Sequence, residues 1–492
     1  MARERFPVKL ALLGGAAAIL LGGAVLAGLS FGEDASVAVS RARPHDVHPP
    51  TIIGIAQVGR ALSVRRGSWS PTPRDYRYTW ERCSSTGKHC HTIAGARGRS
   101  YRCVPADAGG RLRVRVVALD SAGASRAVVS SASGVVTPVT RPGGVTHLEY
   151  VFNDGAVSVY DIDAGFRPVE SFTLPGTTAG VRGVAVAPQT HMMFVSYGGD
   201  GGGNGDGSVL AYDLVGKRVV WSVKLKSGID SGAVSADGKL LYMPDGELSS
   251  DGSWNILDTA NGNVVGKIET PGTGPHDGVL SADGRILLLG ERNYSRLPVY
   301  NTRTGKLQAE IGPLAGGVRP NTINGADSAA FTTATGFDGF EVESLSPPRV
   351  LYSESFGGCS GPFSTCSHGI SLSPDNRELF VIDSVHKAVQ VWDVHGVTEG
   401  IAPAHIGTVP VDGLQGQESG CAYDCGRDGW LQTTLDGRYV IAGDSGDVID
   451  IASDMVIARI PNLLNTREFA EIDWAGGVPV ASSGRQGVGQ LP

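Results

Sequence analysis

Apolar and polar residues alternate along most of this chain in short runs, and turns rich in glycine, proline, aspartate and asparagine separate the runs. Residues 367–383, SHGISLSPDNRELFVID, show the unit: an apolar run, an SPDN turn and a second apolar run. Period-two alternation in short runs is typical of β-strands, and Asp and Asn stabilise the turns between them. The sequence therefore predicts an all-β chain.

The pattern repeats from residue 143 onward. In each copy an acidic or amide residue follows the apolar positions of the third strand: Asp161, Asp213, Asp258, Asn301, Glu343, Asp393 and Asp450. Successive members lie 52, 45, 43, 42, 50 and 57 residues apart. Periods in the forties, with four short strands per copy, are typical of β-propeller blades. The seven copies predict a seven-bladed β-propeller over residues 143–490.

The two ends of the repeat region are complementary. The region opens with HLEYVFNDGAVSVYD, which lacks a preceding innermost strand, and it closes with REFAEIDW, an innermost strand without partners. Joined, the two segments complete one blade, and a closed ring leaves no exposed sheet edge. We therefore expect the last strand to pair beside the first.

Two segments of the repeats, YVFNDGAVSVYDID and LSPDNRELFVIDSVHKAVQVWDV, resemble the YVTN-repeat β-propellers, a group that includes the quinoprotein-dehydrogenase-like propellers. The resemblance covers residues 143–490 and implies the fold. It implies no particular activity, because propellers host many unrelated functions.

Residues 51–138 form a second β-rich unit with runs such as YRYTWERC and RLRVRVVALDSAG. Their alternation suits a β-sandwich whose interior holds Tyr78, Trp80, Val114 and Val116. The unit resembles the Ig-like modules of bacterial surface and secreted proteins, which serve as stalks or adhesive spacers. The resemblance also implies a buried, unreactive thiol at Cys103, because that position is commonly apolar in such modules.

The N-terminus reads as a targeting segment. Basic residues precede an uncharged run, residues 10–31, whose 22 residues would span about 33 Å as a helix, against roughly 30 Å of hydrocarbon. We expect residues 1–32 to be a single-pass signal anchor that leaves the body extracytoplasmic at the cell membrane. Cleavage after Ala27 is the alternative and would secrete the protein. Residues 33–50 read as a linker.

Composition excludes one class of partner. Seventy glycines and 27 prolines among 492 residues favour many tight turns and a folded all-β body. The net charge of -7 provides no basic footprint for nucleic acid, so we expect no nucleic-acid partner.

Seven cysteines fit an oxidising compartment. The economical assignment is three local disulfides: Cys83–Cys90, Cys359–Cys366 and Cys421–Cys425. Crossed pairing among the last four stays open, because sequence does not fix connectivity. A zinc site is the alternative, but the chain has no Cys-x2-Cys doublet.

Counting back from the turn residue of each repeat aligns polar residues that should ring one mouth of the central channel. His276 and His368 are the candidate catalytic residues. The candidate ligand-binding residues are Arg182, Asp230, Asp277, Asn321, Arg427, Asp428 and Glu471. A polar channel mouth is the usual place for a propeller ligand. The competing interpretation is that these side chains only cap neighbouring loops and strand ends.

We expect a cell-surface binding or scaffolding module that takes a protein, glycan or small-molecule ligand at the propeller rim. The alternative is an extracytoplasmic enzyme. A metal-dependent hydrolase or lactonase would hold Ca²⁺ or Mg²⁺ through oxygen atoms of the mouth residues, with His276 or His368 as general base. A lyase would use the same histidines with a divalent ion. Bound metal would favour catalysis.

Overall fold

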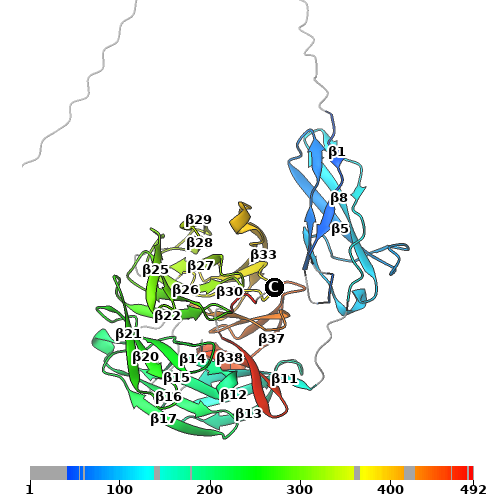
Figure 1. Cartoon of the computed structure of the whole chain (residues 1–492). Helices are drawn as coiled ribbons and strands as arrows, with labels where there is room; N and C mark the ends of the chain where they lie inside the picture. Colours follow the sequence, from blue (N-terminus) through cyan, green and yellow to red (C-terminus); the bar gives the residue numbers. More distant parts are fainter. Residues whose placement is uncertain are drawn as a thin grey trace, which may run out of the picture. The chain divides into compact units, whose positions relative to one another are not determined.

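The computed structural model describes residues 42–54, 56–58, 61–137, 144–153, 155–177, 180–359, 366–414, 427–466, 468–484 and 487–490. The predicted membrane segment, residues 1–32, lies outside these ranges. In the described part the helical segments are short 3-10 turns: η1 (Pro105–Asp107), η3 (Pro188–Thr190), η4 (Gly202–Asn204), η5 (Val397–Glu399) and η6 (Pro461–Asn465). None of the described helices is long and apolar enough to span a membrane. The described chain is all-β, as predicted (Figure 1).

In the N-terminal β region, residues 43–137, the described strands form three antiparallel sheets. They pair β1 (His45–His48) with β4 (Ser68–Ser70); β2 (Thr51–Ile53) with β3 (Ala61–Arg65) and β7 (Ser100–Arg102); and β10 (Val128–Val129) with β8 (Arg111–Asp120), β5 (Asp75–Cys83) and β6 (His91–Thr92), with β9 (Gly123–Ala124) also on β8. Its core includes Tyr78, Trp80, Val114 and Val116, all buried, as the alternation predicts.

Residues 144–484 form seven antiparallel sheets in the described part. Each is given in the order of its hydrogen-bonded neighbours: β39 (Val478–Gly484), β38 (Phe469–Ala475), β11 (Val145–Asn153), β12 (Ala156–Asp161) and β13 (Arg167–Thr173); β14 (Val181–Ala187), β15 (Met192–Gly198), β16 (Gly207–Asp213) and β17 (Arg218–Lys224); β18 (Ala233–Val234), β19 (Leu240–Pro244), β20 (Gly252–Asp258) and β21 (Val264–Thr270); β22 (Pro275–Leu280), β23 (Ile286–Glu291), β24 (Leu297–Asn301) and β25 (Lys306–Ile311); β26 (Val318–Ile323), β27 (Ala329–Ala334), β28 (Gly339–Leu345) and β29 (Pro348–Ser355); β30 (Ile370–Leu372), β31 (Glu378–Asp383), β32 (Ala388–Asp393) and β33 (Ala404–Pro410); β34 (Leu431–Thr433), β35 (Tyr439–Ala442), β36 (Asp447–Asp450) and β37 (Met455–Arg459).

The recurring acidic or amide residue of the repeats has a structural cause. Asp161 ends β12, and its Oδ1 accepts the N–H of Ala164 in the next turn at 2.9 Å. Asp393 ends β32 in the same way and accepts the N–H of His395 at 3.0 Å. A short side-chain acceptor at this place closes an Asx-type turn between the third and fourth strands. In six of the seven described sheets the repeat is therefore a turn signature, whereas Glu343 lies within β28 and accepts the Thr332 hydroxyl at 2.7 Å.

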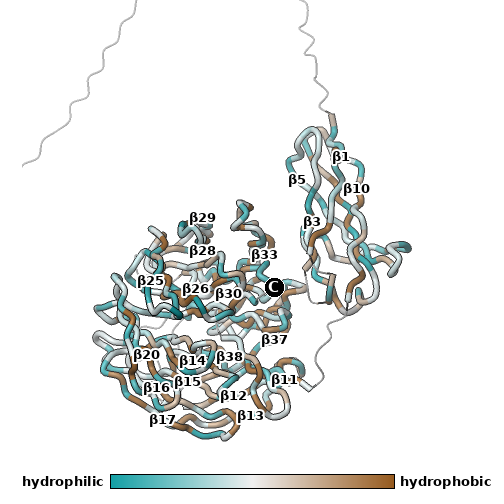
Figure 2. The backbone as a smooth tube through the Cα atoms, in the orientation of Figure 1, coloured by the Kyte–Doolittle hydropathy of each residue, from teal (hydrophilic) through white to brown (hydrophobic). Residues whose placement is uncertain are grey.

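The hydrophobic core lies between neighbouring sheets. Phe331 and Phe340 of the β26–β29 sheet pack with Leu372 and Leu379 of the next one, and the other clusters likewise join adjacent sheets. Figure 2 shows hydrophobic stretches alternating with hydrophilic ones along the strands. Sheets that pack face to face around a common centre make a propeller-type fold.

The last part of the chain closes the ring, as predicted. β38 pairs with β11 in antiparallel register from Val145 opposite Ala475 to Val151 opposite Phe469, and Figure 1 shows the two strands side by side. The pairing satisfies backbone groups that an open array would expose at each end.

A fifth strand and the C-terminal segment go beyond the sequence prediction. β39 adds to the free edge of β38, so the closing sheet has five strands. The chain then reaches two distant sheets. The carbonyl of Gly487 accepts the Thr322 hydroxyl at 2.5 Å, and the N–H of Gln490 donates to the carbonyl of Pro374 at 3.0 Å. The C-terminal segment thus ties the closing sheet to the β26–β29 and β30–β33 sheets.

Candidate functional site

Polar residues at the starts of the innermost strands meet at one mouth of the propeller. Arg182 Nη2 lies 3.6 Å from Asp230 Oδ2, and the rings of His276 and His368 are 5.4 Å apart between centroids. These four residues come from four sheets and were aligned from the sequence repeats. The structure therefore brings them together as the alignment predicts.

Glu247 is the hub of this mouth. Its carboxylate lies 2.7 Å from Arg319 Nη1, 3.4 Å from Arg182 Nη2 and 3.5 Å from Arg292 Nη1. Burial alone would raise the pKa of Glu247, but the nearby guanidiniums, Arg319 foremost, outweigh burial and lower it well below its usual range. The carboxylate is therefore ionised, and it links guanidiniums from three different sheets.

Close backbone packing places Glu247 there. The loop between β19 and β20 touches the glycine-rich loop between β15 and β16, so that a Cβ on Gly246 would lie 2.1 Å from the carbonyl oxygen of Asp200. Gly246 has φ of 96°, a conformation that L side chains rarely adopt. Asp200 is fully buried and lies 3.8 Å from Arg182 Nη2. The glycine-rich segment is thus a packed support for the mouth.

His276 belongs to a short relay of side chains. Its Nδ1 lies 3.1 Å from Asp277 Oδ1, and Asn321 Nδ2 donates to Asp277 Oδ2 at 2.9 Å. Burial, reinforced by Arg319, lowers the pKa of His276 well below its usual range. The imidazole is therefore neutral at pH 7, and the bond to Asp277 places its proton on Nδ1. Its Nε2 is left as an acceptor, 4.0 Å from Glu247 Oε2.

A second histidine–aspartate pair lies beside the first. His368 Nδ1 is 3.2 Å from Asp428 Oδ1. Trp430 packs against both histidines, with its ring parallel to His276 at 5.9 Å and edge-on to His368 at 5.1 Å between centroids. The aromatic contact fixes both imidazoles in orientation.

The mouth differs in accessibility from residue to residue. The side chains of His276 and His368 are 3% and 4% exposed, whereas those of Arg292 and Asp428 are 21% and 14% exposed. A ligand that approaches from solvent meets guanidinium and carboxylate groups first.

Glu471 does not join the mouth. It sits in β38 opposite Glu149 of β11, and its Oε2 accepts the N–H of Leu435 at 2.7 Å. The predicted set of oxygen ligands for Ca²⁺ or Mg²⁺ is therefore not assembled: Asp277 and Asn321 touch each other, Asp428 pairs with His368, and Glu471 lies in another cluster. Arg427 immediately precedes Asp428 in the described segment.

Sequence reasoning missed Glu247, Arg292, Arg319 and Trp430. The repeat alignment places Pro320 and Gly429 at the mouth position of their repeats, and Arg319 and Trp430 are their immediate neighbours in sequence. Glu247 and Arg292 lie in or beside irregular loops, which the repeats do not align.

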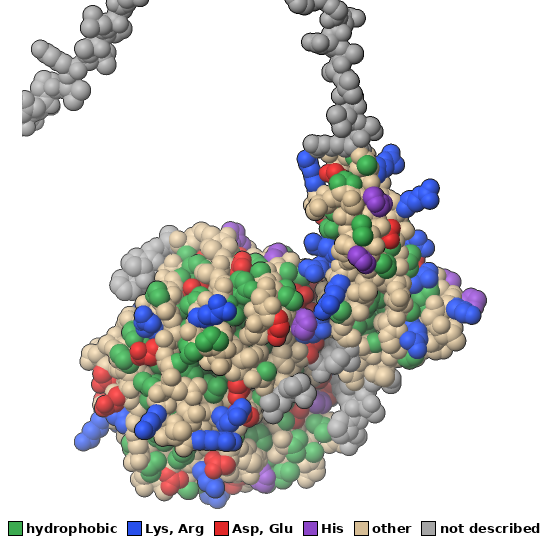
Figure 3. Space-filling view, turned by 45° about the horizontal axis from the view of Figure 1, so that its top comes forward, with side chains coloured by type: hydrophobic (Ala, Val, Ile, Leu, Met, Phe, Trp, Pro, Cys, Tyr) green, Lys and Arg blue, Asp and Glu red, His purple; other side chains and the backbone are tan. Residues whose placement is uncertain are grey.

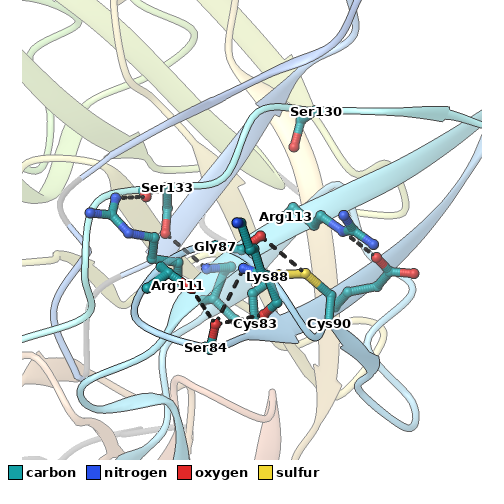
Figure 4. Close-up of a disulfide and its surroundings, with 12 residues drawn as sticks. Cys83, Ser84, Gly87, Lys88, Cys90, Arg111, Arg113, Ser130 and Ser133 are labelled. Atoms are coloured by element: carbon teal, nitrogen blue, oxygen red, sulfur yellow. Dashed lines mark hydrogen bonds and ion pairs between the residues drawn. A yellow bond between two sulfur atoms is a disulfide. The ribbon is translucent and has the colours of Figure 1, made fainter.

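The predicted disulfides Cys83–Cys90 and Cys359–Cys366 are both present. Figure 4 shows the first, at the end of β5, where the Ser84 hydroxyl donates to the carbonyl of Lys88 at 2.7 Å. Cys421 and Cys425 lie outside the described residues. Cys103 is a buried free thiol, and burial raises its pKa to about 12. The two disulfides indicate an oxidising, extracytoplasmic environment.

Charge is divided unevenly along the chain. Residues 43–137 carry 15 Lys and Arg against 5 Asp and Glu, whereas residues 143–490 carry 22 against 41. In Figure 3 basic side chains predominate over the N-terminal β region, while both signs mingle over the propeller. The net charge of the whole chain conceals this division.

Comparison with known proteins names no family. No protein-family model and no curated protein matches the chain. Among solved structures, hydrazine synthase of Kuenenia stuttgartiensis is similar at 14% identity with a TM-score of 0.48, covering 62% of this chain and 92% of that one. At this level no activity, substrate or family membership transfers to this chain.

Proposed function

We propose that the protein is an exported cell-surface recognition module, held at the membrane by residues 1–32, whose propeller binds its ligand at the channel mouth. The N-terminal β region would act as an Ig-like spacer, and the propeller would belong to the YVTN or quinoprotein-like group. Two disulfides support the compartment.

The observation that carries the proposal is the Glu247 network. Guanidiniums from three sheets converge on one buried carboxylate, and His276 and His368 each lie beside an aspartate. A preorganised rim of charged groups suits recognition, because little conformational entropy is lost when a ligand binds. The two histidines are almost fully buried, which suits support of the rim better than direct chemistry.

The basic N-terminal β region supports a surface location. Its excess of Lys and Arg would attract the anionic polymers and lipids of a cell envelope. Such attraction would hold the spacer close to the surface from which it projects.

The test is a ligand screen with a matched pair of variants. The full chain is screened against glycan arrays, peptide arrays and a small-molecule library, and hits are measured with Arg292→Gln and Arg303→Gln. Arg292 lies in the mouth, whereas Arg303 is exposed in the turn between β24 and β25. We expect about tenfold or greater loss of affinity for Arg292→Gln and none for Arg303→Gln. Equal affinity of both variants for every hit would refute the proposal.

One observation favours an enzyme as second candidate. Asn321, Asp277 and His276 form an oriented relay that ends on a neutral imidazole nitrogen, the arrangement of a general base. A panel of ester, lactone and lyase substrates, assayed with and without chelator, tests it. Activity that is lost in His276→Gln would establish catalysis, and an inactive wild-type protein across the panel would leave recognition as the better account.

A further inference from the structure

The seam where the ring closes holds a cluster of acidic residues and one histidine that plays no part in the mouth. In the register of β11 and β38, His147 lies opposite Asp473 and Glu149 lies opposite Glu471. Opposed residues share a face of the sheet, and so do residues two apart on one strand. All four side chains therefore project to the same side.

Three of them offer ligand atoms within reach of one ion. His147 Nδ1 is 2.7 Å from Asp473 Oδ1 and 3.9 Å from Glu471 Oε1, and all three ligand atoms lie within 4.8 Å of one another. Two ligands on a tetrahedral zinc ion are about 3.3 Å apart. The Asp473 and His147 atoms need to separate by only about 0.6 Å to admit the ion.

Two buried carboxylate oxygens at the seam lack hydrogen-bond partners, which is a second indication of a bound ion. Glu471 is fully buried, and within the described residues its Oε1 has no hydrogen-bond partner, although its Oε2 is held by the N–H of Leu435. Glu149 is also fully buried, and its Oε1 likewise lacks a hydrogen-bond partner in the described structure. Buried carboxylate oxygens are normally paired, and leaving one without a partner costs several kcal/mol.

Among the described residues, no guanidinium or ammonium group lies within ion-pair distance of Glu471 or Asp473. Across the described part of the chain, His147 alone lies within ion-pair distance of Glu471 and Asp473. Arg438 on the neighbouring sheet is engaged by Asp436 and Asp163. Within the described structure, a proton or a metal ion would therefore supply the positive charge.

We propose that His147, Glu471 and Asp473 bind a divalent transition-metal ion, with Glu149 beside it. The ion would cross-link β11 and β38, the strand pair that closes the ring. A mixed imidazole and carboxylate set favours Zn²⁺ or Mn²⁺ over Ca²⁺ or Mg²⁺, which prefer oxygen alone. The side chains of His147 and Asp473 are 11% and 9% exposed, which leaves the ion a route from solvent. The site is independent of the function of the mouth.

The described residues include one competing cluster, Asp338, Asp383 and His386. There both oxygens of Asp383 already accept hydrogen bonds from His386, and the His386 side chain is 53% exposed. The buried Asp338, however, also keeps one oxygen, Oδ2, without a hydrogen-bond partner in the described structure, so this cluster is a rival site that the test must distinguish from the seam.

The experiment uses the full chain, stripped with chelator and titrated with Zn²⁺, Mn²⁺ and Ca²⁺ in turn. We expect about one Zn²⁺ or Mn²⁺ per chain, a higher melting temperature with that ion, and little response to Ca²⁺. Bound Co²⁺ should give visible absorption that reports its ligand geometry. His147→Gln and Glu471→Gln should each weaken metal affinity by tenfold or more, and Asp473→Asn provides a third variant should either fail to fold.

His386→Gln and the exposed His395→Gln are the controls and should bind metal as the wild type does. Retention of metal by His147→Gln and Glu471→Gln would overturn the proposal. Loss of metal in His386→Gln alone would assign the ion to the other cluster. A wild-type chain that binds none of the three ions would show that a proton completes the seam.

Discussion

Replacing Glu247 by glutamine removes the charge at the hub of the mouth and keeps the shape of the side chain. The change leaves Arg319, Arg182 and Arg292 without their shared carboxylate. All three guanidiniums are largely buried, with Arg319 the most so at 4% exposure. We expect Glu247→Gln to be among the most destabilising isosteric changes in the propeller.

The distances set the size of the effect. At an effective dielectric constant of about 20, the attraction is about 6 kcal/mol at the 2.7 Å separation from Arg319 and about 5 kcal/mol for each of the other two. Desolvation and repulsion among the guanidiniums offset most of this sum. Removing one partner of a buried ion pair costs about 3–5 kcal/mol, and we expect a value in that range.

Urea unfolding at pH 7, followed by tryptophan fluorescence, measures the change. The matched control is Glu170→Gln, because Glu170 pairs with Lys217 at 2.5 Å but both side chains are exposed. A surface pair of this kind contributes about 1 kcal/mol or less. A double-mutant cycle of Glu247→Gln with Arg319→Gln should give a coupling energy above about 1 kcal/mol. If Glu247→Gln costs no more than Glu170→Gln, the network is not what holds the mouth together.

Three other predictions concern residues away from the hub. Burial raises the pKa of Glu291 from 4.5 to about 7, so the folded state keeps a proton that the unfolded state releases, and stability falls as pH rises through this window. In urea unfolding, the free energy of unfolding of Glu291→Gln should therefore exceed that of the wild type by up to about 3 kcal/mol at pH 8 and by much less at pH 5. An equal difference at both pH values would contradict the raised pKa of Glu291. A Cβ at Gly487 would meet two hydroxyl groups within 2.4 Å, whereas one at Gly484 would meet nothing within 4 Å. In thermal unfolding, Gly487→Val should lower stability by about 1–3 kcal/mol and Gly484→Ala should change it almost not at all. Similar losses of stability in both variants would argue against the packed C-terminal segment. Cys103 should resist thiol reagents in the native protein and react after denaturation, and fast native labelling followed by mass spectrometry would show that the thiol is accessible.

The fold was predictable because each repeat carries its own local signals. The acidic or amide residue at the end of the third strand marks a turn that the backbone needs in nearly every sheet, and Asp161 and Asp393 show its hydrogen bonds. The pairing of the last strand beside the first was likewise predictable, because each end of the repeat region shows on its own which strand of a blade it lacks. The extra strand β39 was not predicted, because its short apolar run, VPVAS, resembles many edge segments.

The mouth was predictable only in part. Residues that start innermost strands, such as His276 and His368, could be aligned by counting along the repeats. Glu247 could not, because its position depends on the contact between two irregular loops through Gly246. The placement of Glu471 failed for a related reason. Its neighbours are set by pairing with residues more than 300 positions away, and a strand register of that kind cannot be read from a single sequence.

Disulfide trapping across the closing seam tests the ring most directly. Thr146 lies opposite Trp474 in the register of β11 and β38, a pairing close enough for a disulfide between cysteines at these positions. Thr146→Cys with Trp474→Cys should form an intramolecular disulfide that peptide mapping by mass spectrometry detects. Thr146→Cys with Val480→Cys, on the strand beyond, should not. If the first pair stayed reduced under oxidising conditions in folded protein, the ring would be open, and the converging mouth and the seam site would both lose their basis.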